Sequence, residues 1–136
     1  MTKLLIGGFL LAHGLIHLSY LSPAPPRTAG GPEWPFEMAR SWLVTGAGLD
    51  AGAARALGTA LAVAAAVLLA GAALATVGWI VPAGWWPALA VGGAVASLAT
   101  LVLFFHPWLV LGLAIDALVL WWALIGDGLE ASWFGP

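Results

Sequence analysis

The chain contains no cysteine and has very little charge. Its 136 residues include four Lys or Arg and six Asp or Glu, and charged residues make up 7% of the total. Without cysteine, disulfides, thiolate metal sites and cysteine nucleophiles are excluded. Soluble domains carry about 25% charged residues, so this chain has too few to cover a water-facing surface. We therefore predict an integral membrane protein whose surroundings are the lipid bilayer.

Several functional classes are excluded by what else is missing. The formal net charge is -2, whereas nucleic-acid binding needs a dense basic surface. The sequence has no Gly-rich phosphate motif, no His-Glu-x-x-His zinc motif and no convincing Ser-His-Asp set. Nucleic acid is therefore excluded as a partner, and no catalytic residue can be assigned from a motif.

Long apolar runs dominate what is present. A transmembrane helix needs about 20 mostly apolar residues, and its backbone groups must be satisfied internally. The first run is longer than the apolar part of a signal peptide, so we interpret it as a retained span. Short connections favour antiparallel neighbours. We predict one all-α domain, residues 1–136, forming an antiparallel up-down bundle with spans at about 3–21, 52–77, 86–105 and 108–125.

The loop of residues 22–51 is the one sizeable polar connection, and we expect it to cap one end of the bundle. Within Glu33–Leu43, large apolar side chains recur every four residues: Trp34, Met38 and Trp42. This spacing predicts a short interfacial helix, with an irregular lid as the alternative. Asp50 is expected to be the N-cap of the second span.

Tryptophan distribution supports the four spans. Aromatic rings prefer both membrane interfaces. One predicted belt, on the side of the termini, contains Trp79, Trp85, Trp86, Trp121, Trp122 and Trp133. The opposite belt contains Trp34, Trp42 and Trp108, with Tyr20. Arg27, Arg40 and Arg55 lie on the loop side, so the positive-inside rule places the long loop in the cytoplasm.

Two histidines, His13 and His17, lie one helical turn apart inside the first span. Ionisable groups are costly in hydrocarbon and usually mark a functional site. At about 1.5 Å per residue, antiparallel threading places Asp116 at a depth similar to His13, with His17 above them and His106 at the rim. We therefore expect His13 and Asp116 to face each other.

Two imidazoles and a carboxylate form a common donor set for Zn, Fe(II) or Mn. We predict that His13, His17 and Asp116 bind a divalent metal ion or a small polar ligand, with His106 at the mouth. Alternatively, a His–Asp hydrogen bond ties helices together in an accessory or scaffold subunit of a larger complex. A proton relay, or a lipid-modifying enzyme with histidine as general base, is also open.

Smaller residues give further expectations about packing. Ser97 and Thr100 form a mild polar stripe on the third span, and Gly112 allows close approach one turn before Asp116. Small residues recur every four positions on the second span: Gly58, Ala62, Ala66 and Ala70. Such a face suits tight helix packing within the bundle, against a second copy in a homo-oligomer, or against another protein.

Several short segments carry a resemblance in their order. They are Leu11–Leu18, Pro35-Phe36, Arg40–Leu43, Trp85-Trp86 and His106–Asp116. With these, the chain resembles a group of small four-span bacterial membrane proteins with an N-terminal His-Gly-x-x-His, often loosely labelled permeases. The likeness runs from the first span to the last. It implies the topology and the bacterial inner membrane, and no catalytic residue.

Overall fold

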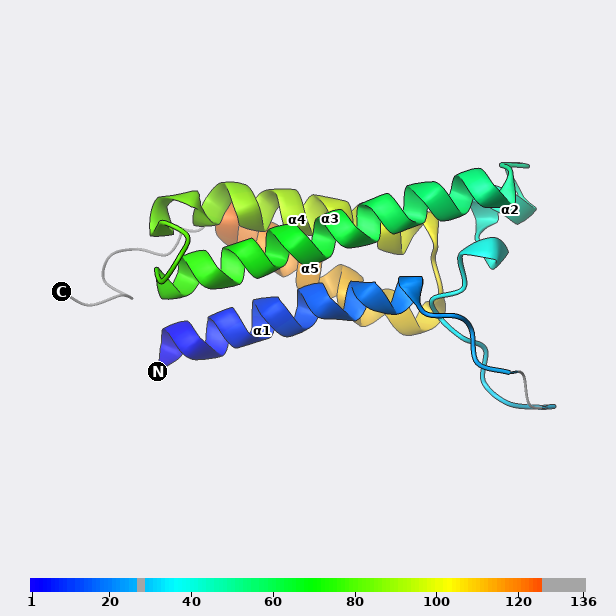
Figure 1. Ribbon diagram of the computed structural model, residues 1–136, viewed down its shortest axis with the longest axis horizontal. Helices are drawn as coiled ribbons and strands as arrows, with labels where there is room; N and C mark the ends of the chain where they lie inside the picture. Colours follow the sequence, from blue (N-terminus) through cyan, green and yellow to red (C-terminus); the bar gives the residue numbers. More distant parts are fainter. Residues whose placement is uncertain (27–28, 126–136) are drawn as a thin grey trace.

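The computed structural model describes residues 1–26 and 29–125, and within them the chain is helical without strands. The α-helices are α1 (Thr2–Ile16), α2 (Trp42–Thr45), α3 (Ala51–Val77), α4 (Trp86–Leu103) and α5 (Val110–Leu124). Short 3₁₀ turns lead into or out of them: η1 (His17–Leu21), η2 (Met38–Arg40), η3 (Ala83–Trp85) and η4 (Pro107–Leu109). Figure 1 shows the four long helices side by side, with residues 22–26 and 29–50 at one end.

Four helical segments are long and apolar enough to cross a membrane: Thr2–Leu21, Ala51–Val77, Ala83–Leu103 and Pro107–Leu124. These bounds agree with the predicted spans to within three residues. The first, third and last segments each combine an α-helix with a 3₁₀ turn. Helix α3 begins at an N-cap: Asp50 Oδ1 accepts the Ala53 N–H at 3.0 Å, which confirms the predicted N-cap. At the other end of α3, Gly78 has the left-handed φ of 69° that glycine tolerates.

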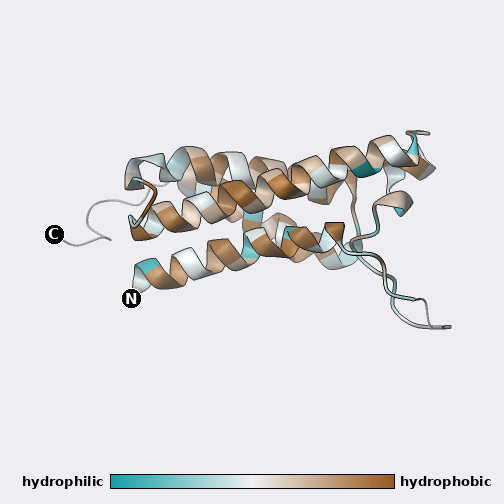
Figure 2. Ribbon diagram, in the orientation of Figure 1, coloured by the Kyte–Doolittle hydropathy of each residue, from teal (hydrophilic) through white to brown (hydrophobic). Residues whose placement is uncertain are grey.

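Helix α3 lies at the centre of the fold and packs against both α1 and α4, while α4 packs against α5. Its contact faces consist largely of alanine, and the predicted small-residue face is buried at Gly58, Ala62 and Ala66. The outward faces keep large apolar side chains such as Leu5 and Leu111, each more than 70% exposed. Figure 2 shows apolar residues along the length of every long helix. An apolar surface of this extent fits lipid rather than water.

The prediction of one interfacial helix over Glu33–Leu43 is wrong. Residues 33–37 are irregular, and only the short turns η2 and α2 follow, separated by Ser41 with an extended ψ of 153°. Met38 is 6% exposed because it packs over Gly58, where an added Cβ would lie 2.6 Å from its sulfur. Met38 therefore joins the core, which overrides the amphipathic spacing.

The exposure of the tryptophan side chains fits the predicted belts only in part. Five rings of the two belts are largely exposed at the helix ends: Trp42, Trp79, Trp85, Trp108 and Trp121. Trp86 is instead 1% exposed and packs against Trp122, with ring centroids 5.1 Å apart. Tyr20 is also buried, so neither it nor Trp86 is an interfacial anchor. Trp133 lies outside the described residues.

Candidate functional site

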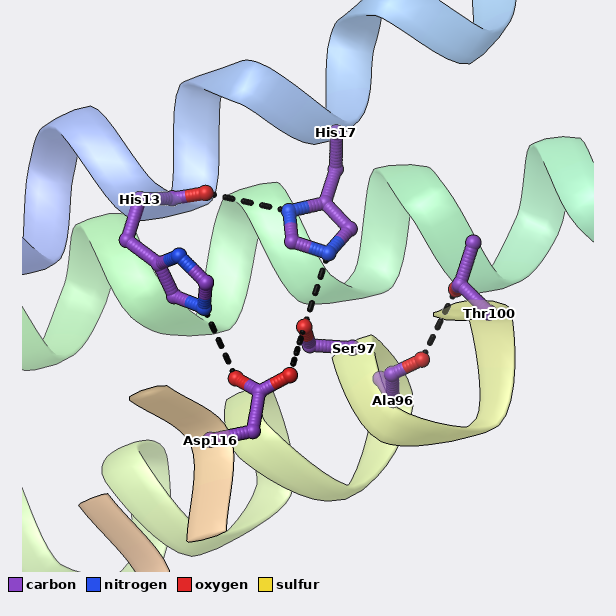
Figure 3. A network of polar contacts seen from close by, with 6 residues as sticks. All are labelled: His13, His17, Ala96, Ser97, Thr100 and Asp116. Atoms are coloured by element: carbon purple, nitrogen blue, oxygen red, sulfur yellow. Dashed lines mark hydrogen bonds and ion pairs between the residues drawn. The ribbon is translucent and has the colours of Figure 1, made fainter. Parts of the chain in front are cut away.

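His13 and Asp116 meet between α1 and α5, as their predicted depths require. Nε2 of His13 lies 2.8 Å from Oδ1 of Asp116. Asp116 is fully buried and His13 is 8% exposed. Oδ1 accepts this bond whether Asp116 is ionised or carries a proton on Oδ2, and Nε2 of His13 then carries the hydrogen. Figure 3 shows this pair at one side of a larger polar network.

His17 is held by the backbone where α1 tightens into η1. The His17 N–H bonds to the carbonyl of Gly14, as in a 3₁₀ turn. The side chain bonds to the preceding turn, because Nδ1 of His17 donates to the His13 carbonyl at 3.0 Å. This bond fixes a hydrogen on Nδ1 and points Nε2 of His17 toward α4.

Ser97 on α4 connects the two polar groups. Its Oγ lies 2.7 Å from His17 Nε2 and forms a second hydrogen bond with Oδ2 of Asp116. Ser97 is fully buried. Sequence reasoning placed Ser97 only on a polar stripe and missed this role. The rise per residue could have found it, because Ser97 lies about 14 Å before His106, at the depth of Asp116.

Two polar residues named in the sequence analysis, Thr100 of the polar stripe and His106 of the predicted site, remain outside the network. Thr100 donates its hydroxyl to the Ala96 carbonyl of its own helix at 2.8 Å. His106 lies where α4 gives way to η4, and its Nδ1 accepts the Trp108 N–H at 3.2 Å. It therefore closes a local turn instead of reaching Asp116.

The predicted metal ligands are thus only partly brought together. His13 contacts Asp116, His17 contacts Ser97, and His106 is engaged elsewhere. Across residues 1–26 and 29–125, no group of three or more His, Asp or Glu side chains is placed to hold a metal ion. A metal site at these residues stays a prediction, for which the structure supplies one His–Asp pair.

Leu69 of α3 sets the spacing of the helices that carry the network. It is fully buried between glycines of both neighbouring helices. A Cβ added at Gly14 of α1 would lie 2.9 Å from Leu69 Cβ, and one at Gly93 of α4 would lie 2.7 Å from Leu69 Cγ. Gly14 adjoins His13, and Gly93 lies one turn before Ser97. The two glycines therefore bring α1 and α4 close enough for His17 to reach Ser97.

A cavity of about 160 Å³ lies beside the network and is called the inner cavity here. Its lining includes His13, His17, Tyr20, Gly112 and Ile115 from α1, η1 and α5. Among the described helices, α1 and α5 do not pack closely, and the His13–Asp116 contact bridges them. Two other lining residues, Ile16 and Leu111, are exposed on the outer surface. The inner cavity therefore opens toward the apolar exterior between these two helices.

The hydrogen bonds of the network require a particular number of hydrogen atoms, and this number determines its protonation state. Three contacts run in series from the His13 carbonyl through His17 and Ser97 to Asp116. Each contact needs one hydrogen, and the carbonyl supplies none. A neutral imidazole supplies one and the serine hydroxyl a second. All three hydrogen bonds therefore exist together only when Asp116 and His17 share one added proton.

Two arrangements satisfy this requirement. In the first, Asp116 is a carboxylic acid that donates to Ser97, and Ser97 donates to His17. In the second, His17 is an imidazolium that donates to Ser97, and Ser97 donates to the carboxylate. They differ by a shift of two protons through the serine hydroxyl. In both, the group is electrically neutral overall, which avoids the cost of burying a net charge in apolar surroundings.

Comparisons with protein families, with curated proteins and with solved structures found no match for this chain.

Proposed function

We propose that the four long helices cross a bacterial inner membrane as an antiparallel bundle, and that the network inside it binds a small polar ligand and exchanges a proton with it. The apolar outer faces and the four candidate spans support membrane insertion. The inner cavity supports ligand entry from the bilayer between α1 and α5. Its volume of about 160 Å³ is close to that of cavities of about 150 Å³ that accept benzene. The proposed ligand is therefore small and carries its polar group on an apolar body.

The observation that carries this proposal is the series of three contacts from the His13 carbonyl through His17 and Ser97 to Asp116, which needs one added proton. The proton can rest on either end of the series through the serine hydroxyl, and one end, His17, lines the inner cavity. Intramembrane histidine and aspartate commonly serve in such proton relays. A purely structural pair would need only the His13–Asp116 bond, whereas this network adds a path to the cavity wall.

The first prediction concerns this proton. At neutral pH, infrared spectra of the purified protein are expected to show the carbonyl stretch of a protonated carboxyl group, or ¹⁵N spectra to show His17 protonated on both nitrogens. The difference between wild type and Asp116→Asn isolates the Asp116 signal. Asparagine supplies an N–H toward Ser97, so the variant should leave His17 protonated on Nδ1 alone.

Thr100→Val is the matched control for this measurement. Thr100 is buried one turn from Ser97, but its hydroxyl bonds only to its own helix. The proton signal should therefore be unchanged in Thr100→Val and altered in Ser97→Ala. An ionised Asp116 together with a singly protonated His17 in the wild type would contradict the proposal.

The metal alternative has its own test. Mass spectrometry of detergent-purified protein is expected to find far less than one metal ion per chain, because the donor atoms of the network are engaged with one another. A double variant, His13→Ala/His17→Ala, provides the comparison. Near-stoichiometric metal that this variant loses would establish a metal site and displace the proton-exchange proposal.

A second candidate function is an accessory or scaffold subunit of a larger membrane complex, or a homo-oligomer, in which the network only ties helices together. The bridging of α1 and α5 by His13 and Asp116 favours it, because few other contacts join these helices. Asp116→Asn separates the two functions. It keeps the hydrogen-bond partners but removes the exchangeable proton, so a scaffold would tolerate it.

A further inference from the structure

A second and larger cavity lies at the end of the fold that carries residues 29–50, and is called the loop-end cavity here. Its volume is about 460 Å³, and its lining includes Tyr20, Trp34, Phe36, Met38, Gly52 and Arg55. The lining comes from η1, from the long loop and from the first two turns of α3 (Figure 1). The His13–Asp116 network takes no part in it.

Two hydrogen-bond donors in this lining are buried without partners among the described residues. They are Oη of Tyr20 and Nε1 of Trp34. Tyr20 is 4% exposed, and its ring packs edge-on against Phe36 with centroids 5.1 Å apart. A buried hydroxyl or indole N–H without a partner is costly, so such groups indicate an acceptor that belongs at the site.

Arg55 gives the same cavity a positive charge. It lies in the second turn of α3 and lines the cavity, and no hydrogen bond or ion pair engages it within the described part of the chain. Arg40 contrasts with it, because its Nη1 forms an ion pair with Glu33 at 2.8 Å. Glu37 also lines the cavity, but it already interacts with another group. The cavity therefore combines a cation with two neutral donors.

We infer that the loop-end cavity binds the phosphate group of a lipid headgroup. Phosphate oxygens accept several hydrogen bonds at once and pair well with guanidinium, which matches Arg55, Tyr20 and Trp34. In the proposed topology the cavity lies at the loop ends of the first two spans, at headgroup level, where tyrosine and tryptophan are enriched. The acyl chains of the lipid then lie against the exposed apolar faces of the long helices.

The test is native mass spectrometry of the purified protein in detergent micelles titrated with dioleoylphosphatidylglycerol. We expect one molecule of this lipid to bind to each chain more tightly than any further molecules do. Arg55→Gln and Tyr20→Phe should each weaken that binding about tenfold or more, since each removes one hydrogen bond to a charged group. Tyr20→Phe keeps the ring and its packing, so it tests the hydroxyl alone. Arg40→Gln is the matched control and should leave binding unchanged.

Two further probes identify the source of the phosphate. Dioleoylglycerol, which lacks phosphate, should not compete, and millimolar inorganic phosphate should compete only weakly. Full displacement by inorganic phosphate would overturn the lipid assignment. Equal binding of dioleoylglycerol, or unchanged binding in both Arg55→Gln and Tyr20→Phe, would overturn the site, with water then pairing the buried donors. Neither outcome affects the proton signal of Asp116, so this inference and the proposed function fail separately.

Discussion

Replacing Asp116 by leucine is expected to lower the free energy of unfolding by about 3 kcal/mol, whereas Asp116→Asn should lower it by less than about 1 kcal/mol. Leucine fills a similar volume but accepts nothing. It would remove the bonds to His13 and Ser97, each worth about 0.6–1.7 kcal/mol between membrane helices. A buried imidazole N–H left without a partner adds about 1–3 kcal/mol.

Asparagine reproduces the protonated form of Asp116. Its carbonyl oxygen accepts from Nε2 of His13, and its amide N–H donates to Ser97, which can then donate to His17. The measurement is unfolding in mixed micelles by increasing SDS, followed by circular dichroism. A loss in Asp116→Asn as large as that in Asp116→Leu would mean that an ionised carboxylate, not a protonated one, stabilises the fold.

The spans could be predicted closely because their determinants are local. Apolar length located the four segments, and Asp50 marked where α3 begins. The prediction for Glu33–Leu43 failed because apolar side chains four residues apart fit a surface helix and also fit an irregular loop that buries one of them. Burial of Met38 against Gly58 depends on α3, which a pattern within the loop does not include. The prediction for Trp86 failed for a similar reason, because its ring packs against Trp122 of α5, a residue distant in the sequence.

The site could be predicted in part. Similar depth, together with the cost of exposing either group to lipid, predicts that His13 and Asp116 face each other, and the structure confirms it. The partner of His17 could not be chosen among the ionisable residues, because it is a neutral serine. His106 was predicted at the mouth from its depth, but the short turn through Pro107 and Trp108 engages it locally. The rise per residue predicts the position of a residue along the helix axis, but it does not predict which way the side chain points around that axis.

Helix spacing at Leu69 gives the second large prediction. Gly14→Val is expected to cost about 2–3 kcal/mol in the free energy of unfolding, in the range of overpacked cores. The first added carbon would already lie 2.9 Å from Leu69 Cβ and 3.3 Å from the Ala66 carbonyl oxygen. Backbone cannot yield as a flexible side chain can, so α1 must move away from α3.

Gly8→Val is the matched control, because it places the same side chain on α1 where no atom lies within 4 Å of the added Cβ. It should change stability by less than about 0.5 kcal/mol, as surface substitutions do. Gly14→Val should also weaken the proton signal of Asp116, because moving α1 separates His17 from Ser97. Loss of stability with the proton signal intact would show that α1 shifts along its axis, and that the spacing set by Leu69 is not what holds the network together.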